Sequence, residues 1–227
     1  DVFLLGDRLA GRALSYVEHA RYRNCDGILI ISGMDSIKRI ATEMRTLDRP
    51  VVCVDYQFEG FGSVISDNER GMRELVSYIC EQGHRRIAFI HGNDSQVTRL
   101  RLESFLSTCR QFGLRIPREY IVPARFCNAE ASAEATRFLL SLSNRPTCIL
   151  YPDDYAAVGG MNAIRERGLR IPEDISVAGY DGIPLGKHLQ PQLTTIKQDT
   201  EQIGVAAARE LISLIERPKS TLIEQIT

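Results

Sequence analysis

Four aspartates directly follow short apolar runs of the kind that form buried strands: Asp55, Asp67, Asp153 and Asp181. Asp181 is the clearest case, because it ends the run ISVAGY and is followed by Gly182. In an open parallel sheet, ligands bind beyond the carboxyl ends of the strands. A row of carboxylates at that edge predicts a polar ligand site, since each carboxylate can accept hydrogen bonds from ligand donors.

A second interpretation of Asp181 stays open on these residues alone. Asp-Gly is a common turn pair, so Asp181 and Gly182 could simply form the turn after the strand. Asp153 and Asp154 pose a similar choice, because one of them could cap the helix expected to start near Ala156, and Asp154 is the better candidate for that cap.

The chain alternates apolar runs with stretches of helical periodicity, which predicts an α/β fold with parallel sheets. Gly83, Gly113 and Gly168 follow three of the expected helices, as left-handed helix stops do. The expected strands are 2–5, 26–32, 50–55, 63–66, 85–92, 120–125, 145–152, 175–180 and 193–199, and the expected helices are 13–22, 37–47, 69–81, 98–112, 129–142, 156–167 and 200–215.

Composition excludes several classes of protein. With 227 residues, 44% of them hydrophobic and 25% charged, the chain suits one large or two small globular domains. No apolar run is long enough to cross a bilayer, and the first residues lack the pattern of a signal peptide. The net charge of -1 and the scattered lysines and arginines leave no basic stripe for nucleic acid.

The six cysteines are dispersed, without a C-x-x-C pair or a histidine at metal-ligand spacing. We expect neither a zinc site nor a disulfide framework, and free thiols favour the cytosol. They are Cys25, Cys53, Cys80, Cys109, Cys127 and Cys148.

Phrases that span almost the whole chain carry a family resemblance. They are DGILII, RPVVCVD, ISDNERG, QGHRRIAFIHG, TRLRLESF, RPTCILYPDDYAAVGGMNAIRERGLRIPEDISVAGYDGIPLG and QPQLTTIKQD, and the run from Arg145 to Asp199 is the most specific. In these phrases the chain resembles the effector-binding domain of the LacI/GalR family of bacterial transcription regulators, which shares the fold of periplasmic sugar-binding proteins.

That resemblance implies two Rossmann-like, parallel-sheet subdomains joined by three crossing strands, with the ligand between them. Residues 1–67 and 197–227 are expected to form the N-terminal subdomain, and residues 68–196 the C-terminal one. By the same comparison, the family's first strand and helix, its DNA-binding headpiece and its closing strand are expected to fall outside this sequence.

The resemblance also implies ligand contacts, each at a matching position of this sequence. Asp55 would reach sugar hydroxyls, Arg101 would donate to ligand oxygens, Phe126 would pack on the ligand, and Asp181 would fix it. Asp67 would lie beside the cleft and Asp153 at a variable position of the site. Two alternatives remain: Arg99 could point inward in place of Arg101, and Phe126 could be plain core.

Three classes of function compete: a ligand-sensing domain, an extracytoplasmic sugar carrier and an enzyme. The sequence has no nucleophile elbow, phosphate loop or H-E-x-x-H motif, and Gly60-Phe61-Gly62 precedes a strand rather than a helix. Two carboxylates could suit a glycosidase, but the resemblance favours a regulator. It implies a homodimer, DNA contact only through the headpiece, and no cofactor. The acids favour a neutral sugar or polyol over its rivals, a purine or a sugar phosphate.

Overall fold

The computed structural model describes residues 1–6, 8–9, 12–31, 34–217 and 223–226. The chain divides into two compact units, which we call unit 1 (residues 1–66 and 199–226) and unit 2 (residues 67–198). It passes between them after Ser66 and again after Gln198. Ser32, expected in a strand, and residues 218–222 and 227, expected in the N-terminal subdomain, lie outside the described residues.

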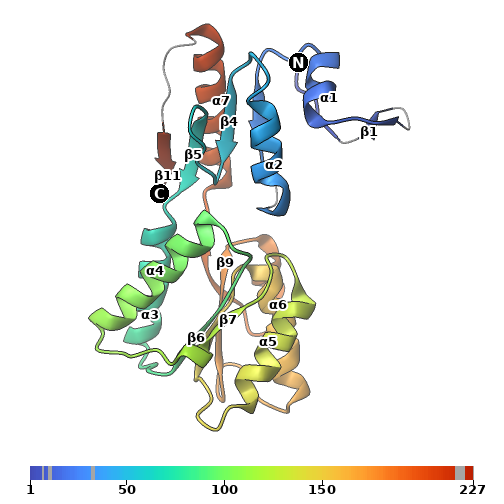
Figure 1. Cartoon of the computed structure of the whole chain (residues 1–227). Coiled ribbons are helices and arrows are strands. Elements are labelled where there is room, and N and C mark those ends of the chain that lie inside the picture. Colours follow the sequence, from blue (N-terminus) through green and yellow to red (C-terminus); the bar gives the residue numbers. More distant parts are fainter. Residues whose placement is uncertain (7, 10–11, 32–33, 218–222, 227) are drawn as a thin grey trace. The chain divides into compact units, whose positions relative to one another are not determined.

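Unit 1 contains a four-stranded parallel sheet with the order β11-β5-β4-β3. One face of the sheet packs Cys53 and Val51 against the helix side chains Val17, Ile40 and Ala41. The other face packs Val52 and Val64 against α7 (Figure 1). The elements are β1 (Arg8–Leu9), β2 (Arg12–Ala13), α1 (Tyr16–Tyr22), β3 (Ile28–Ile30), α2 (Met34–Met44), β4 (Val51–Val54), β5 (Gly62–Ser66), α7 (Thr200–Glu216) and β11 (Ile223–Ile226).

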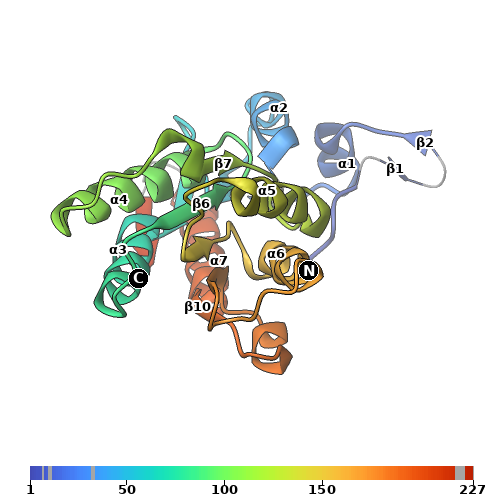
Figure 2. The same cartoon turned by 90° about the horizontal axis from the view of Figure 1, so that it is seen from below.

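Unit 2 contains a five-stranded parallel sheet with the order β10-β9-β8-β6-β7. Helices α3 and α4 cover one face around Phe89 and Phe105, and α5 and α6 cover the other around Ile149 and Leu139 (Figures 1 and 2). The elements are α3 (Asn68–Glu81), β6 (Ile87–His91), α4 (Gln96–Gln111), β7 (Ile121–Pro123), α5 (Ala129–Ser141), β8 (Cys148–Leu150), α6 (Asp154–Glu166), β9 (Ser176–Asp181) and β10 (Thr194–Lys197), with short 3-10 turns at Arg118–Tyr120 and Pro184–His188.

The α/β prediction is confirmed, and so are the glycine stops. Gly83, Gly113 and Gly168 have φ of 92°, 73° and 69°, the left-handed conformation that ends a helix cheaply only at glycine. A parallel sheet needs strands buried on both faces, and the central strands β6 and β8 are buried along almost their whole length.

The strand expected at residues 2–5 is wrong. These residues are in no strand, and Val2 and Leu4 are 97% and 96% exposed. A strand exists only through pairing, and no described strand pairs with this run; β3 forms the edge of the sheet. The first helix also begins later than expected, at Tyr16, because Ser15 caps it in a capping box with Glu18.

Candidate functional site

Asp181 ends β9 with a positive φ of 106°, which is rare for a residue with a side chain. Its Oδ1 accepts a hydrogen bond from Nε2 of Gln198 at 2.5 Å, and its carbonyl accepts one from N of Gln198 at 3.1 Å. Burial raises the pKa of Asp181 to about 6, while the Arg101 guanidinium and the Gln198 hydrogen bond act in the opposite direction. Asp181 therefore combines a desolvated carboxyl group with a strained backbone at the carboxyl edge of the sheet, and both features are common at functional sites.

Arg101 is the buried cation of the same unit. It comes from α4, is only 4% exposed, and donates from Nε to Oδ1 of Asn68 at 2.7 Å and from Nη1 to the Pro152 carbonyl at 2.9 Å. Its Cζ lies 3.5 Å from the ring centroid of Tyr180. Arg99, the alternative, instead pairs with Asp94 at the surface. Arg101 is thus the inward arginine, and its contact with ligand stays a prediction.

Phe126 lies against the backbone of Gly92. It is half-buried, and a Cβ built on Gly92 would come within 2.1 Å of its Cε2. Its ring centroid is 6.0 Å from Cζ of Arg101, and its N donates to Oδ1 of Asn93 at 3.3 Å. A half-exposed aromatic face beside an arginine can cover the apolar side of a ligand ring.

The expected roles of Asp153 and Asp154 need correction, because Asp153 and not Asp154 caps α6. Asp153 is 1% exposed and accepts from N of Ala156 at 2.8 Å and from N of Cys127 at 2.7 Å. The helix begins at Asp154, two residues before the expected start, which shifts the cap to the preceding residue. Both carboxylate oxygens of Asp153 thus serve backbone donors, so its main observed role is structural.

Asp154 connects three segments at the same edge. Its carboxylate accepts from N of Ile183 at 2.8 Å and from Oγ1 of Thr195 at 2.6 Å, and burial raises its pKa. Cys127, whose N donates to Asp153, has φ of 52°, and burial, followed by the charges of Asp153 and Asp181, raises the pKa of its thiol. The loop ends after β7, β8 and β9 therefore converge at one edge of unit 2.

The two remaining predicted residues, Asp55 and Asp67, accept hydrogen bonds from nearby protein groups. Asp55, with φ of 57°, accepts from both N and Oγ of Ser66 at 3.0 Å. Asp67 caps α3 by accepting from N of Arg70 at 3.0 Å. Arg101, Phe126, Asp153 and Asp181 are brought together within unit 2, Asp67 begins that unit, and Asp55 belongs to unit 1.

Sequence reasoning missed Gln198 and Asn68, which hold the charged groups of the site. Both stand inside motifs that are notable for other reasons, Gln198 in LTTIKQD and Asn68 in ISDN. An amide immediately beside an acid at the end of a strand is the signal that could have found them.

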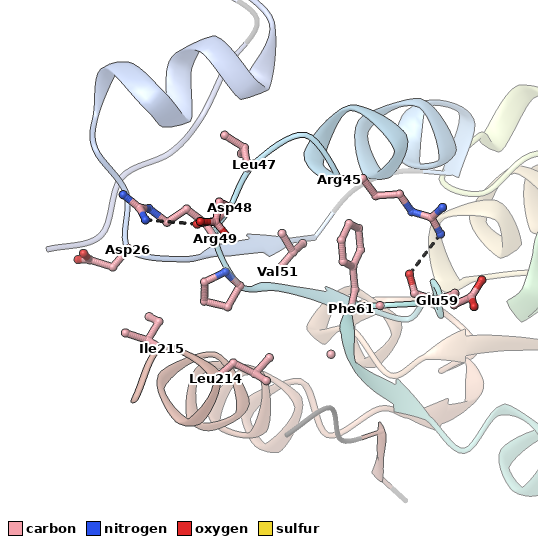
Figure 3. A pocket seen from close by; sticks show the side chains of 13 residues that line it. Asp26, Arg45, Leu47, Asp48, Arg49, Val51, Glu59, Phe61, Leu214 and Ile215 are labelled. Carbon is pink, nitrogen blue, oxygen red and sulfur yellow. Dashed lines mark hydrogen bonds between the residues drawn. The ribbon is translucent and has the colours of Figure 1, made fainter. Parts of the chain in front are cut away.

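Unit 1 has a cavity of about 960 Å³ at the opposite edge of its sheet, where β3, β4 and β5 begin (Figure 3). Arg45 donates to the Glu59 carbonyl at 3.2 Å and Arg49 donates to the Asp48 carbonyl at 3.2 Å, so both guanidiniums are hydrogen-bonded to the backbone of other residues that line the cavity. None of the predicted ligand residues lines this cavity. It lies at the amino ends of the strands, where parallel sheets do not usually bind ligand.

Other kinds of site find little support in the described residues. These contain no cluster of three or more histidine, cysteine or acidic side chains that could hold a metal ion. All six cysteines are unpaired, as expected, and four of them are buried. Within the described ranges, no helix combines the length and apolar character needed to span a membrane.

Two units, each with a parallel sheet covered by helices on both faces, match the fold of periplasmic binding protein-like domains. Residues 76–226 match the family model of the periplasmic binding protein-like domain, so the chain belongs to that family, and its relatives are LacI-family repressors.

The chain is 34% identical over 198 residues to the "Probable HTH-type transcriptional repressor ExuR" of Bacillus subtilis, covering 86% of this chain and 59% of that protein. It is 34% identical over 205 residues to the ribose operon repressor of Escherichia coli K12, covering 89% and 62%. A LacI family regulator from Enterococcus faecium with bound ribose matches with a TM-score of 0.81 and 26% identity, covering 94% and 80%. The chain spans about three fifths of the length of these two curated relatives.

Proposed function

We propose that this chain is the ligand-sensing part of a bacterial transcriptional regulator and that its effector is a neutral sugar bound at the carboxyl edge of the unit 2 sheet. The observation that carries this proposal is the partly buried Asp181 carboxyl at the end of β9, which feels the charge of the buried Arg101 guanidinium. The bound ribose of the Enterococcus faecium regulator and the name of the Escherichia coli ribose operon repressor support the ligand class.

The chemistry of the edge suits hydroxyl groups. A carboxylate can accept from two neighbouring hydroxyls at once, and such charge-assisted bonds contribute roughly 1.5 to 3 kcal/mol each where water is excluded. Phe126 supplies an apolar face for one side of a sugar ring. Together these groups match a molecule with hydroxyls on its edge and C–H groups on its face.

The charges at the edge disfavour an anionic effector. Burial raises the pKa of Asp181 most, and the charges of Asp153 and Asp154 raise it further, because the three carboxyl groups repel one another. The guanidinium of Arg101 is the buried counter-charge, and two of its nitrogens already donate to Asn68 and Pro152. A phosphate or carboxylate would add a further negative charge at close range, whereas a neutral sugar would not.

The assignment of a sugar effector also implies how the complete regulator would act on DNA. We propose that a DNA-binding headpiece carries operator recognition, that effector occupancy shifts the population of its binding-competent state, and that the regulator acts as a homodimer in the cytosol without catalytic activity. The repressor relatives favour this over an extracytoplasmic carrier.

A thermal-shift screen tests the proposal. We expect a neutral sugar from a panel of D-ribose, cellobiose, ribose 5-phosphate and hypoxanthine to raise the melting midpoint by roughly 5 to 10 °C at a hundredfold Kd. Asp181→Asn should abolish the shift. Asp94→Asn, at an exposed acid of the same unit, should keep it. A shift produced only by the phosphate or the base would show that the proposed ligand class is wrong.

A further inference from the structure

The two places where the chain passes between the units share one local arrangement. After Ser66 the chain enters α3, and after Gln198 it enters α7. At each passage the residue before the boundary donates to an aspartate at the end of the neighbouring parallel strand. Ser66 donates to Asp55 at the end of β4, and Gln198 donates to Asp181 at the end of β9.

The residue after each boundary is an aspartate that caps the helix that follows it. Asp67 accepts from N of Arg70 at 3.0 Å, and Asp199 accepts from N of Gln202 at 2.9 Å, so each caps the helix that follows. Both strand-end acids have positive φ, 57° at Asp55 and 106° at Asp181. The same combination of a strand-end acid and a helix cap therefore occurs at both passages, in two separate sheets.

The two arrangements differ in how the acid is held. Ser66 holds Oδ1 of Asp55 with both its N and its Oγ, through a short side chain. Gln198 holds Oδ1 of Asp181 through its long side chain, while its N bonds the Asp181 carbonyl. At Asp181 the backbone bond can therefore persist while the side-chain bond changes.

From this difference, and resting on the proposed function, we infer that Gln198 is a positioning residue for effector binding. Its amide fixes the Asp181 carboxylate for the effector's hydroxyls, at the residue after which the chain leaves unit 2. Other charged groups act on Asp181 as well: Arg101 from α4, and Asp153 and Asp154 from the start of α6. The thiol of Cys127 feels the charge of Asp181 in turn.

A purely structural tie predicts something different. If Gln198 only fastened the loop, its removal would lower the melting temperature and raise the pKa of Asp181, but it would leave the Kd of D-ribose unchanged at pH 8, where Asp181 is ionised. If Gln198 positions Asp181, its removal also weakens D-ribose binding at pH 8, because the ionised carboxylate loses the hydrogen bond that holds it in place.

The test compares Gln198→Ala, Gln198→Glu and the control Gln111→Ala, which removes an exposed glutamine of α4. Carbon-13 NMR follows the Asp181 carboxyl through pH 4 to 8 without effector, and calorimetry measures the Kd of D-ribose at pH 5.5 and 8. We expect Gln198→Ala to raise the Asp181 pKa and to weaken D-ribose binding roughly 10- to 100-fold at pH 8. Gln111→Ala should match the parent.

The isosteric Gln198→Glu supplies a signature that a loop tie lacks. When the introduced carboxyl is protonated, it can donate a hydrogen bond to Asp181 as the amide does. Gln198→Glu should therefore bind D-ribose more tightly than Gln198→Ala at pH 5.5 and should lose this advantage at pH 8. An unchanged Asp181 titration in Gln198→Ala, or an unchanged Kd of D-ribose at pH 8, would overturn the inference. If D-ribose fails to bind the parent while the titration shifts, the proposed effector is wrong, but the hold of Gln198 on Asp181 stands.

Discussion

The guanidinium of Arg101 lies close enough over Tyr180 that its Cζ is 3.5 Å from the ring centroid. The charge of Arg101 lowers the pKa of Asp181, the residue after Tyr180, so this stacking holds a positive charge near the acid that we assign to the effector. Gly71 makes room for the arrangement, since a Cβ at this position would lie 2.2 Å from the Tyr180 hydroxyl. The cation is thus placed by packing before any ligand arrives.

Replacing Arg101 with methionine should therefore destabilise the protein by about 2 to 4 kcal/mol, because Asn68 and the Pro152 carbonyl lose a buried charged donor. Arg101→Lys should not restore stability, since an ammonium cannot reproduce the planar stacking and the divergent donors. Urea unfolding measures both, with the exposed Arg99→Met as control. Equal stability of the Lys variant and the parent would refute the stacking argument.

The free energy of unfolding should depend on pH through Asp181. Its pKa is about 6 in the folded protein and about 3.9 when unfolded. Between these values the folded state keeps a proton that the unfolded state has released, so stability falls as pH rises from about 4 to 6 and is flat above. Asp181→Asn removes this contribution and should be more stable than the parent above pH 6 by roughly 2 to 3 kcal/mol.

Denaturant melts of the parent and Asp181→Asn at pH 4.5 and 7.5 check this. The difference in unfolding free energy between the two proteins cancels the contributions of the other titrating groups, which both proteins share. A stability difference that is the same at both pH values would contradict a raised pKa at Asp181.

Asp153→Ala should destabilise the protein by about 1 to 3 kcal/mol, because the buried N of Ala156 and the partly buried N of Cys127 both lose their acceptor. Asp94→Ala, at an exposed acid, should cost less than about 0.5 kcal/mol. Calorimetric melting of the two variants decides the point. If Asp153→Ala has the same melting temperature as the parent, the cap formed by Asp153 contributes nothing measurable to stability.

Gly92→Ala should weaken effector binding without a large loss of stability. The new Cβ would meet the Phe126 ring at 2.1 Å and push it away from Arg101, but the ring is half-buried and can turn outward. We expect a several-fold rise in Kd by calorimetry. Gly204→Ala, which meets nothing within 4 Å on the exposed side of α7, serves as control and should stabilise its helix slightly. An unchanged Kd in Gly92→Ala would remove Phe126 from the site.

Much of the fold could be predicted because parallel strands buried on both faces leave continuous apolar runs, such as IAFI in β6. The run at residues 2–5 has the same pattern, but pairing depends on a neighbouring strand that a local pattern cannot reveal. The sequence places the cap at Asp154 instead of Asp153 because a cap is defined by the first helical residue, and helix starts are uncertain by one or two positions.

The site could be predicted only in part for a related reason. The buried side of α4 includes Thr98, Arg101, Ser104 and Thr108, so a hydrophobic pattern understates how far Arg101 is buried. The importance of Gln198 lies in its contact with Asp181, which is 17 residues away in the sequence. Polar contacts of this kind depend on tertiary packing rather than on local periodicity.

The pH dependence of sugar binding tests the role of Asp181 most directly. Calorimetry from pH 5 to 8 should give a neutral sugar, D-ribose as first probe, an affinity that is constant above about pH 6 and falls by up to tenfold per pH unit below it, because only the ionised Asp181 accepts two hydroxyl donors. Asp181→Asn should bind weakly at every pH. An affinity that ignores both pH and Asp181→Asn would contradict the assignment of Asp181 as the effector's anchor.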